Sequence, residues 1–211
     1  MTTNLENAGA FWGDLEVRQR PRGGREINGR FPYNKRAVTS SGGRRGRPEK
    51  EEILSRAFKF RIEDPKEEIH LLSGHRYDKP LATKLQGTLK IRDTADAVEF
   101  TAAISDEISE VTHVRDALAL LKSGLAVGIS PGFMMPPERA VPRSEAEEFV
   151  DEPINPSAGQ HGAKIRQIKQ ALLFELSIVT RPVYIEANAE LRAEDMAATP
   201  DLRTALRRWR L

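Results

Sequence analysis

The chain has 211 residues, no cysteine and a formal net charge of +2 at pH 7. Its length suits one domain with tails, and a chain without cysteine forms neither disulfides nor thiolate metal sites. No apolar run approaches the roughly 20 residues of a membrane span, and the N-terminus lacks the basic and apolar regions of a signal peptide, so we expect no membrane partner.

The charge is unevenly distributed along the chain. Residues 1–50 carry eleven Lys or Arg against five Asp or Glu, a net charge of +6, and residues 201–211 carry a net charge of +3. The middle of the chain is therefore acidic. Basic ends on an acidic body indicate contact with an anionic partner, and a solvated, flexible tail explains them equally well.

The first 80 residues predict short elements separated by loops. Residues 1–24 contain proline and paired glycines without a sustained hydrophobic period, which predicts a flexible N-terminal arm. The segments that follow are an extended stretch at 25–31, a flexible basic loop at 40–50, a helical turn or two at 51–58, an apolar strand at 69–73 and a loop at 74–80.

The next segments predict a β-hairpin and then a helix. Residues 82–104 alternate between apolar and polar side chains over much of their length, around a turn at 92–96. Ser105 or Ser109 would cap the helix, whose apolar side chains recur three and four positions apart. Gly124 is the expected left-handed stop.

The C-terminal part predicts a loop, two strands and an amphipathic tail. Residues 136–162 combine prolines and acids without a period, which is typical of a surface loop. Residues 164–169 alternate, and 171–180 form an apolar run with one acid, as in a buried strand. From Thr199 onward, apolar positions share a helical face beside several arginines, which predicts a basic amphipathic helix.

One serine, Ser130, lies between Gly128 and Gly132 just after the predicted helix. Glycines beside a serine leave room for a substrate backbone and allow an N–H to be aimed at a developing oxyanion. The Gly-x-Ser-x-Gly pattern also marks the nucleophile elbow of another hydrolase fold, but there a strand precedes the serine and a helix follows it. Here the order is reversed, and Pro131 disfavours a following helix. A glycine-rich turn is the competing interpretation.

His75 follows the apolar strand at 69–73, where a neutral imidazole would be well placed as a general base. The alternative is an exposed loop histidine. His70 and His75 are five positions apart, which is the wrong spacing for two metal ligands on one helix face. We therefore expect neither a metal nor another cofactor.

Glu175 lies within the apolar run at 171–180, where burial of an unpaired carboxylate would be costly. A histidine partner would offset this cost and orient the imidazole, as the acid of a catalytic triad does. Alternatively, Glu175 points to solvent on a one-sided sheet and shares its face with Ser177. Arg181, at the end of the strand, would donate toward an oxyanion or would simply lie at the surface.

These motifs occur in an order that resembles the phage prohead (capsid maturation) proteases, which are distantly similar to the herpesvirus assemblins. The motifs are Gly-Arg-Phe-Pro-Tyr, Gly-His at a strand end, Lys-Ser-Gly-Leu, Gly-Ile-Ser-Pro-Gly-Phe and Phe-Glu-Leu-Ser-Ile-Val-Thr-Arg-Pro. With this resemblance we expect an α+β, mainly β fold, an antiparallel β-barrel with a few packed helices. The expected organisation is an arm at 1–24, a protease domain at 25–192 and a tail with the basic helix at 193–211.

The resemblance implies a serine endopeptidase that acts through an acyl-enzyme. The family's serine falls on Ser130, its histidine on His75 and its acidic member on Glu175. His161 competes for the third position, because the herpesvirus relatives use a second histidine.

The expected oxyanion site is less regular than the family pattern. Arg181 lies where the herpesvirus relatives keep an arginine near the oxyanion. Pro131 replaces the small or branched residue expected after the serine and removes an N–H. The donor would then be Gly132 N–H, a water or Arg181.

By resemblance, the substrates are the scaffolding segment of the major capsid protein and the chain's own tails. Cleavage would occur inside the immature capsid, the prohead, in the host cytoplasm. The helix from Thr199 would dock on capsid or scaffold protein, and self-association is left open.

Two rival functions remain. The first is a non-enzymatic capsid assembly or scaffold-binding factor that uses its basic arms. The chain has no readable nucleic-acid motif and only two Trp and three Tyr for stacking, so we expect no specific nucleic acid partner. The second is an esterase-like hydrolase, which ranks last because nothing marks a deep apolar acyl pocket.

Overall fold

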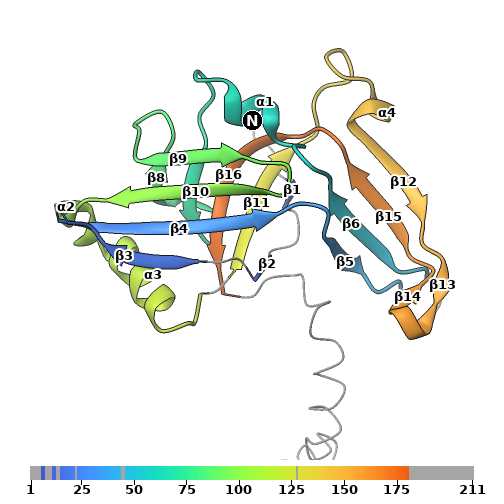
Figure 1. Cartoon of the computed structure of the whole chain (residues 1–211), viewed down its shortest axis with the longest axis horizontal. Helices are drawn as coiled ribbons and strands as arrows, with labels where there is room; N and C mark the ends of the chain where they lie inside the picture. The colour runs from blue at the N-terminus through green and yellow to red at the C-terminus, as the bar shows by residue number, and fades with distance from the viewer. Residues whose placement is uncertain are drawn as a thin grey trace, which may run out of the picture.

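A computed structural model of the chain describes residues 6–7, 11–12, 15–21, 23–43, 46–126 and 128–180. Its elements are mainly β-strands, which confirms the predicted class. Most of the strands form two sheets packed face to face and a third sheet that extends to one side (Figure 1), and two short strands form a small hairpin. Within the described ranges these sheets stay open, and no closed barrel is found.

Sheet A carries the candidate site. Its strand order is β1 (Glu6–Asn7), β11 (Gly128–Met134), β16 (Leu172–Val179), β7 (His70–Ser73) and β8 (Arg76–Thr83), and β2 (Phe11–Trp12) also pairs with β11. In its centre β16 runs antiparallel to β11 and parallel to β7. The strands β7, β11 and β16, which are distant in sequence, therefore lie side by side.

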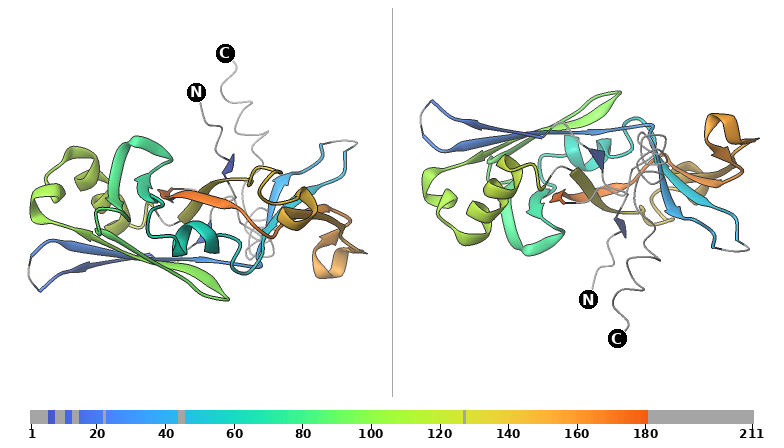
Figure 2. Two further views of the ribbon diagram at one scale, coloured as in Figure 1. Left: turned by 90° about the horizontal axis from the view of Figure 1, so that it is seen from above. Right: turned by 90° about the horizontal axis from the view of Figure 1, so that it is seen from below.

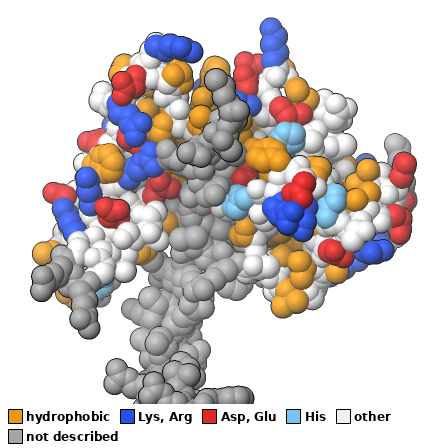
Figure 3. All heavy atoms as spheres, turned by 180° about the vertical axis from the view of Figure 1, so that it is seen from behind, with side chains coloured by type: hydrophobic (Ala, Val, Ile, Leu, Met, Phe, Trp, Pro, Cys, Tyr) orange, Lys and Arg blue, Asp and Glu red, His pale blue; other side chains and the backbone are white. Residues whose placement is uncertain are grey.

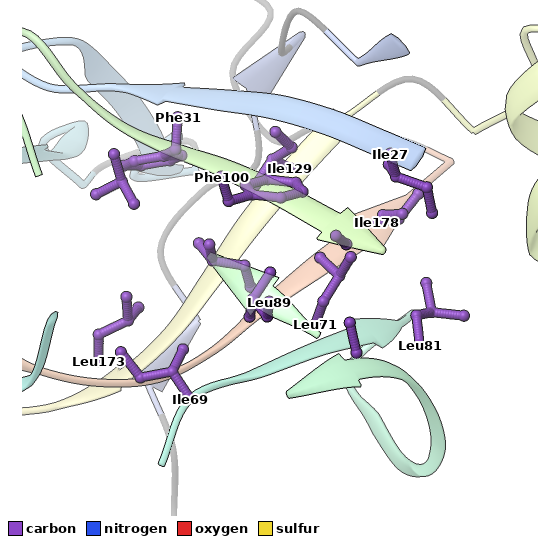
Figure 4. Packing of buried hydrophobic residues seen from close by; sticks show 14 of the residues in the cluster. Ile27, Phe31, Ile69, Leu71, Leu81, Leu89, Phe100, Ile129, Leu173 and Ile178 are labelled. Atoms are coloured by element: carbon purple, nitrogen blue, oxygen red, sulfur yellow. The ribbon is translucent and has the colours of Figure 1, made fainter. Parts of the chain in front are cut away.

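Sheet B covers one face of sheet A. Its strand order is β3 (Glu16–Gln19), β4 (Arg25–Pro32), β10 (Ala97–Ile104) and β9 (Leu89–Asp93). Between the sheets, Ile27 and Phe100 from sheet B face Ile129, Ile178 and Leu71 from sheet A (Figure 4). Full burial of such a side chain stabilises the fold by about 1.5–3 kcal/mol, so this cluster fixes the inner face of sheet A.

Sheet C lies beside the two packed sheets (Figures 1 and 2). Its strand order is β5 (Arg36–Ser40), β6 (Glu49–Ile53), β15 (Lys164–Ile168) and β12 (Glu147–Asp151). A small hairpin follows β12 and contains β13 (Ile154–Asn155), the 3-10 turn η1 (Pro156–Ala158) and β14 (Gln160–His161). Ion pairs replace much of the apolar core here, and one joins buried Lys50 and Glu152 at 2.9 Å.

The helices of the described chain are short. They are α1 (Lys59–Glu63), α2 (Asp106–Ser109), α3 (Thr112–Lys122) and α4 (Arg143–Ala146). Ser105 caps α2, since its Oγ accepts the Ile108 N–H at 3.2 Å, and Gly124 follows α3 with φ +69°. The predicted helix is confirmed in place but is divided into α2 and α3.

Several predicted elements are wrong. Residues 51–58 are not a helical turn, because β6 continues to Ile53 and α1 begins only at Lys59. The predicted loop at 74–80 is only the Gly74–His75 turn, after which β8 begins. Residues 136–162 hold α4, β12 and the small hairpin.

The physical reason is tertiary pairing that a local pattern does not contain. Lys and Glu favour helices, but in β6 the Lys50 side chain is buried against Glu152, and Glu52 accepts a hydrogen bond from Gln167 at 2.9 Å. The first strand of the predicted hairpin is also shorter than expected, because residues up to Thr83 belong to β8 and β9 begins at Leu89.

The structure tests the prediction for the N-terminal arm in part and does not describe the predicted C-terminal tail. β3 lies within the predicted arm at 1–24 and pairs with β4. The predicted tail at 193–211, with its helix from Thr199, lies outside the described residues. The boundaries of arm, domain and tail stay predictions. None of the helices in the described part of the chain has the length and apolarity that a membrane span requires.

Candidate active site

The pairing of β11 with β16 places four residues on one face of sheet A. Ser130 lies opposite Ser177, and Gly132 lies opposite Glu175. Residues directly opposite in antiparallel strands point to the same face, with Cβ atoms about 4.5–5.5 Å apart, and alternate residues of one strand share a face. Because Ile129 and Ile178 point into the core (Figure 4), these four residues lie on the outer face of sheet A.

His75 reaches the same face from the neighbouring strand. β7 ends at Ser73, and the Gly74–His75 turn leads into β8. His75 adopts φ +61°, a left-handed conformation that is uncommon for a residue with a side chain. The Gly74 N–H donates to Ile178 O at 3.0 Å, and the His75 N–H donates to Ser177 Oγ at 2.9 Å. The turn is therefore held against β16.

Glu175 is the buried acid of the site and is fully paired. It is 1% exposed. Its Oε1 lies 2.6 Å from His75 Nδ1, and its Oε2 accepts the Ser177 O–H at 2.7 Å. These two contacts offset the cost of burying a carboxylate. The structure thus brings together the predicted base and the predicted acid.

Gly132 makes room for that acid. A Cβ built on Gly132 would lie 2.1 Å from Glu175 Oε1. The glycine is therefore required by the carboxylate itself, a reason the sequence pattern did not indicate. Its backbone lies between β1 and β16. Its predicted role as an oxyanion donor stays a prediction, and Arg181 lies outside the described residues.

Ser130 and His75 differ in their exposure to solvent. Ser130 is 3% exposed, whereas 26% of the His75 side chain is exposed. Figure 3 views the molecule from the side of sheet A, where histidine side chains reach the surface beside acidic and basic ones. The imidazole is thus open to solvent on one side and bonded to the buried acid on the other.

Four aromatic or basic side chains, in two contacting pairs, lie near the site and were not predicted to belong to it. His70 lies opposite Glu175 in the parallel register of β7 and β16, and its ring meets Tyr77 edge-on at 5.6 Å. Burial and the charge of Glu175 raise the pKa of Tyr77. Arg61 stacks over the Phe174 ring at 3.9 Å. For His70 the sequence offered one indication, since residues 70 and 72 of a strand lie on the same face.

His161, the competing third member, lies elsewhere. It belongs to β14 of the small hairpin beside sheet C (Figures 1 and 2), where it pairs with Ile154. Its N–H donates to Glu152 Oε2 at 3.0 Å, and its side chain is exposed. The residue placed against His75 is Glu175. In the described ranges, no three His, Asp or Glu side chains are grouped in a way that would hold a metal ion.

Comparison with known proteins identifies a family for the chain. The family model of the caudovirus prohead serine protease matches residues 33–201, which include Ser130, His75 and Glu175. Searches of curated proteins and of solved structures find no match. Since the family model spans most of the chain, the chain belongs to the caudovirus prohead serine protease family.

Proposed function

We propose that the chain is a serine endopeptidase in which Ser130 is the nucleophile, His75 the general base and Glu175 the residue that orients His75. One observation supports these roles above all. The 2.6 Å contact between His75 Nδ1 and Glu175 Oε1 forms on the face of sheet A that also carries Ser130. Family membership supports the reaction class.

The geometry suggests how the proton would move. A carboxylate accepts but does not donate, so Glu175 holds the tautomer of His75 that carries its proton on Nδ1. The lone pair on Nε2 is then free to accept the proton of Ser130 as Oγ attacks the carbonyl carbon of a peptide bond. As the C–N bond breaks, Nε2–H protonates the leaving amine, and an ester on Ser130 remains.

Hydrolysis of that ester would complete the cycle. His75 Nε2 accepts a proton from water, the hydroxide attacks the acyl carbon, and Ser130 leaves with the proton returned from the imidazolium. Negative charge develops on the carbonyl oxygen in both steps and requires donors. Gly132 N–H, a water and Arg181 are the donors we propose for it.

The proposed substrates are the scaffolding segment of the major capsid protein and the chain's own ends. Family membership supports a capsid protein as substrate. The ends of the chain carry net charges of +6 over residues 1–50 and +3 over 201–211, which suits contact with an acidic scaffold segment. The proposed place of action is the prohead.

Intact-mass spectrometry of the chain and its capsid protein, produced together, tests this proposal. We expect the native chain to shorten the capsid protein or itself and the Ser130→Ala variant to leave both whole. Ser123→Ala is the matched control, because Ser123 is an exposed serine after α3 whose Oγ donates only to Leu120 O. Equal cleavage by the native chain and Ser130→Ala would exclude Ser130 as the nucleophile. No cleavage by either would favour the assembly-factor function.

A further inference from the structure

Ser177 is a buried polar residue that the proposed mechanism does not use. It is 0% exposed. Its Oγ accepts the His75 N–H at 2.9 Å and donates its own proton to Glu175 Oε2 at 2.7 Å. Together with the 2.6 Å contact between His75 Nδ1 and Glu175 Oε1, these bonds close a ring through all three residues.

The ring of hydrogen bonds holds His75 in its left-handed backbone conformation. A non-glycine residue in a left-handed conformation persists only when its surroundings hold it there. Two consecutive N–H groups of the turn donate to β16, Gly74 to Ile178 O and His75 to Ser177 Oγ. Without the Ser177 hydroxyl, the His75 N–H would lose its acceptor and the turn would lose one of these two restraints.

The same hydroxyl fixes the orientation of the acid. Glu175 presents Oε1 to His75, and its other oxygen would be unpaired on the protein side without the Ser177 proton. A carboxylate held by both oxygens cannot rotate about its last bond without breaking a bond. Ser177 therefore restrains the imidazole twice, through the backbone of His75 and through its acid.

We propose that Ser177 is a positioning residue that sets the His75 imidazole toward Ser130. The proposal rests on the proposed function, since the orientation of His75 matters only if His75 is the base. If Ser177 served only to fill space, any side chain of similar volume would suffice at this position. The two bonds need a group that accepts and donates at once, as a hydroxyl does.

A fluorophosphonate tests the effect on reactivity without requiring the natural substrate. Ser130 Oγ would attack phosphorus, the P–F bond would break with loss of fluoride, and His75 would take the serine proton. Intact mass then gives the rate of labelling. We expect Ser177→Ala to slow labelling about 10- to 100-fold, as small misplacements of a catalytic group do, and Ser177→Thr, which keeps the hydroxyl, to restore most of the rate.

Thr83→Val is the matched control. Thr83 Oγ1 is a buried hydroxyl with no hydrogen-bond partner among the described residues, so Thr83→Val removes a buried hydroxyl without breaking a bond of the ring. We expect this variant to label at the native rate. If Ser177→Ala does not fold, Ser177→Cys tests the same loss, because a thiol of similar size is a weak donor and acceptor.

Nitrogen NMR of the His75 imidazole separates positioning from stability. In the native chain we expect the tautomer with the proton on Nδ1, and in folded Ser177→Ala a mixture of tautomers. Native nitrogen shifts in Ser177→Ala would overturn the proposal, whatever the labelling rate. If the native chain does not label at all, the proposed function fails, but the NMR comparison still decides whether Ser177 positions His75.

Discussion

Gly132 and Glu175 lie opposite each other on β11 and β16, and a Cβ on Gly132 would fall 2.1 Å from Glu175 Oε1. That oxygen is the one that contacts His75 Nδ1. The carboxylate therefore occupies space that any other residue at position 132 would fill. Gly132 therefore has a structural role that the Gly-x-Ser-x-Gly pattern does not indicate, which is to leave room for the acid of the site.

Gly132→Ala is expected to displace the Glu175 carboxylate and slow the reaction of Ser130 by tenfold or more, since a misplaced catalytic group costs on the order of 10²-fold. The measurement is the rate of fluorophosphonate labelling, with circular dichroism to confirm folding. Gly124→Ala is the control. It introduces a side chain at φ +69° with open space around it, so it lowers stability by about 1–2 kcal/mol and leaves the labelling rate unchanged. If folded Gly132→Ala labels at the native rate, the position of the Glu175 carboxylate does not control the reactivity of Ser130.

Glu175→Gln is expected to slow the labelling of Ser130 by about 10²- to 10⁴-fold while keeping the size of the side chain. A carboxamide can donate its N–H to His75 Nδ1 and so favour the tautomer whose proton is on Nε2, which cannot accept the serine proton. His161→Ala, the variant of the competing third residue, is expected to change the rate less than twofold. The reverse ranking of the two variants would make His161 the third member.

Glu152 gives a prediction on stability and pH. Burial opposes ionisation of this carboxylate, but hydrogen bonds from Lys50 and from the N–H groups of Ala163 and His161 outweigh burial and hold its pKa below the ordinary value. Because the pKa is lower in the folded state, the pair stabilises the fold above the unfolded pKa, about 4.3. That stability is lost as the pH falls through the folded pKa.

We therefore expect Glu152→Gln to lower the free energy of unfolding at pH 7 by about 3 kcal/mol, because it removes the charge of the carboxylate that is buried against Lys50. It should also flatten the fall in stability below about pH 4.3. Urea denaturation at several pH values measures both effects. Glu148→Gln is the control, since its ion pair with Lys169 is exposed and is worth about 1 kcal/mol at most. Equal pH slopes for Glu152→Gln and the native chain would contradict this account.

The three principal candidates were accessible from the sequence because each breaks a local rule. Glu175 is a carboxylate in an apolar strand, and it is indeed buried and paired. His75 directly follows an apolar strand, and Ser130 lies between glycines. At each of these positions the local pattern therefore singled out one residue as a candidate for the site. The cost of burying an unpaired acid indicated that Glu175 needs a donor, but the assignment of His75 to the site came from the family resemblance.

What the sequence could not supply depends on contacts between distant strands. Ser177 was expected only to share a face with Glu175, and its bond to the His75 backbone depends on the Gly74–His75 turn beside β16. Residues 49–50 of β6 were predicted as loop and 51–53 as a helical turn, because the pairing of β6 with β15 and the contact of Lys50 with Glu152 join residues more than 100 positions apart. Arg181 and the helix from Thr199 lie outside the described residues, so those predictions stand as they were.

The location of the fluorophosphonate adduct tests the central claim most directly. After labelling, the chain is digested and the mass of the peptide that carries Ser130 is measured for the native chain and for His75→Ala. The account predicts an adduct on Ser130 in the native chain and little or none in His75→Ala. An adduct on another residue, or equal labelling of Ser130 in both proteins, would contradict the assignment of Ser130 and His75 as nucleophile and base.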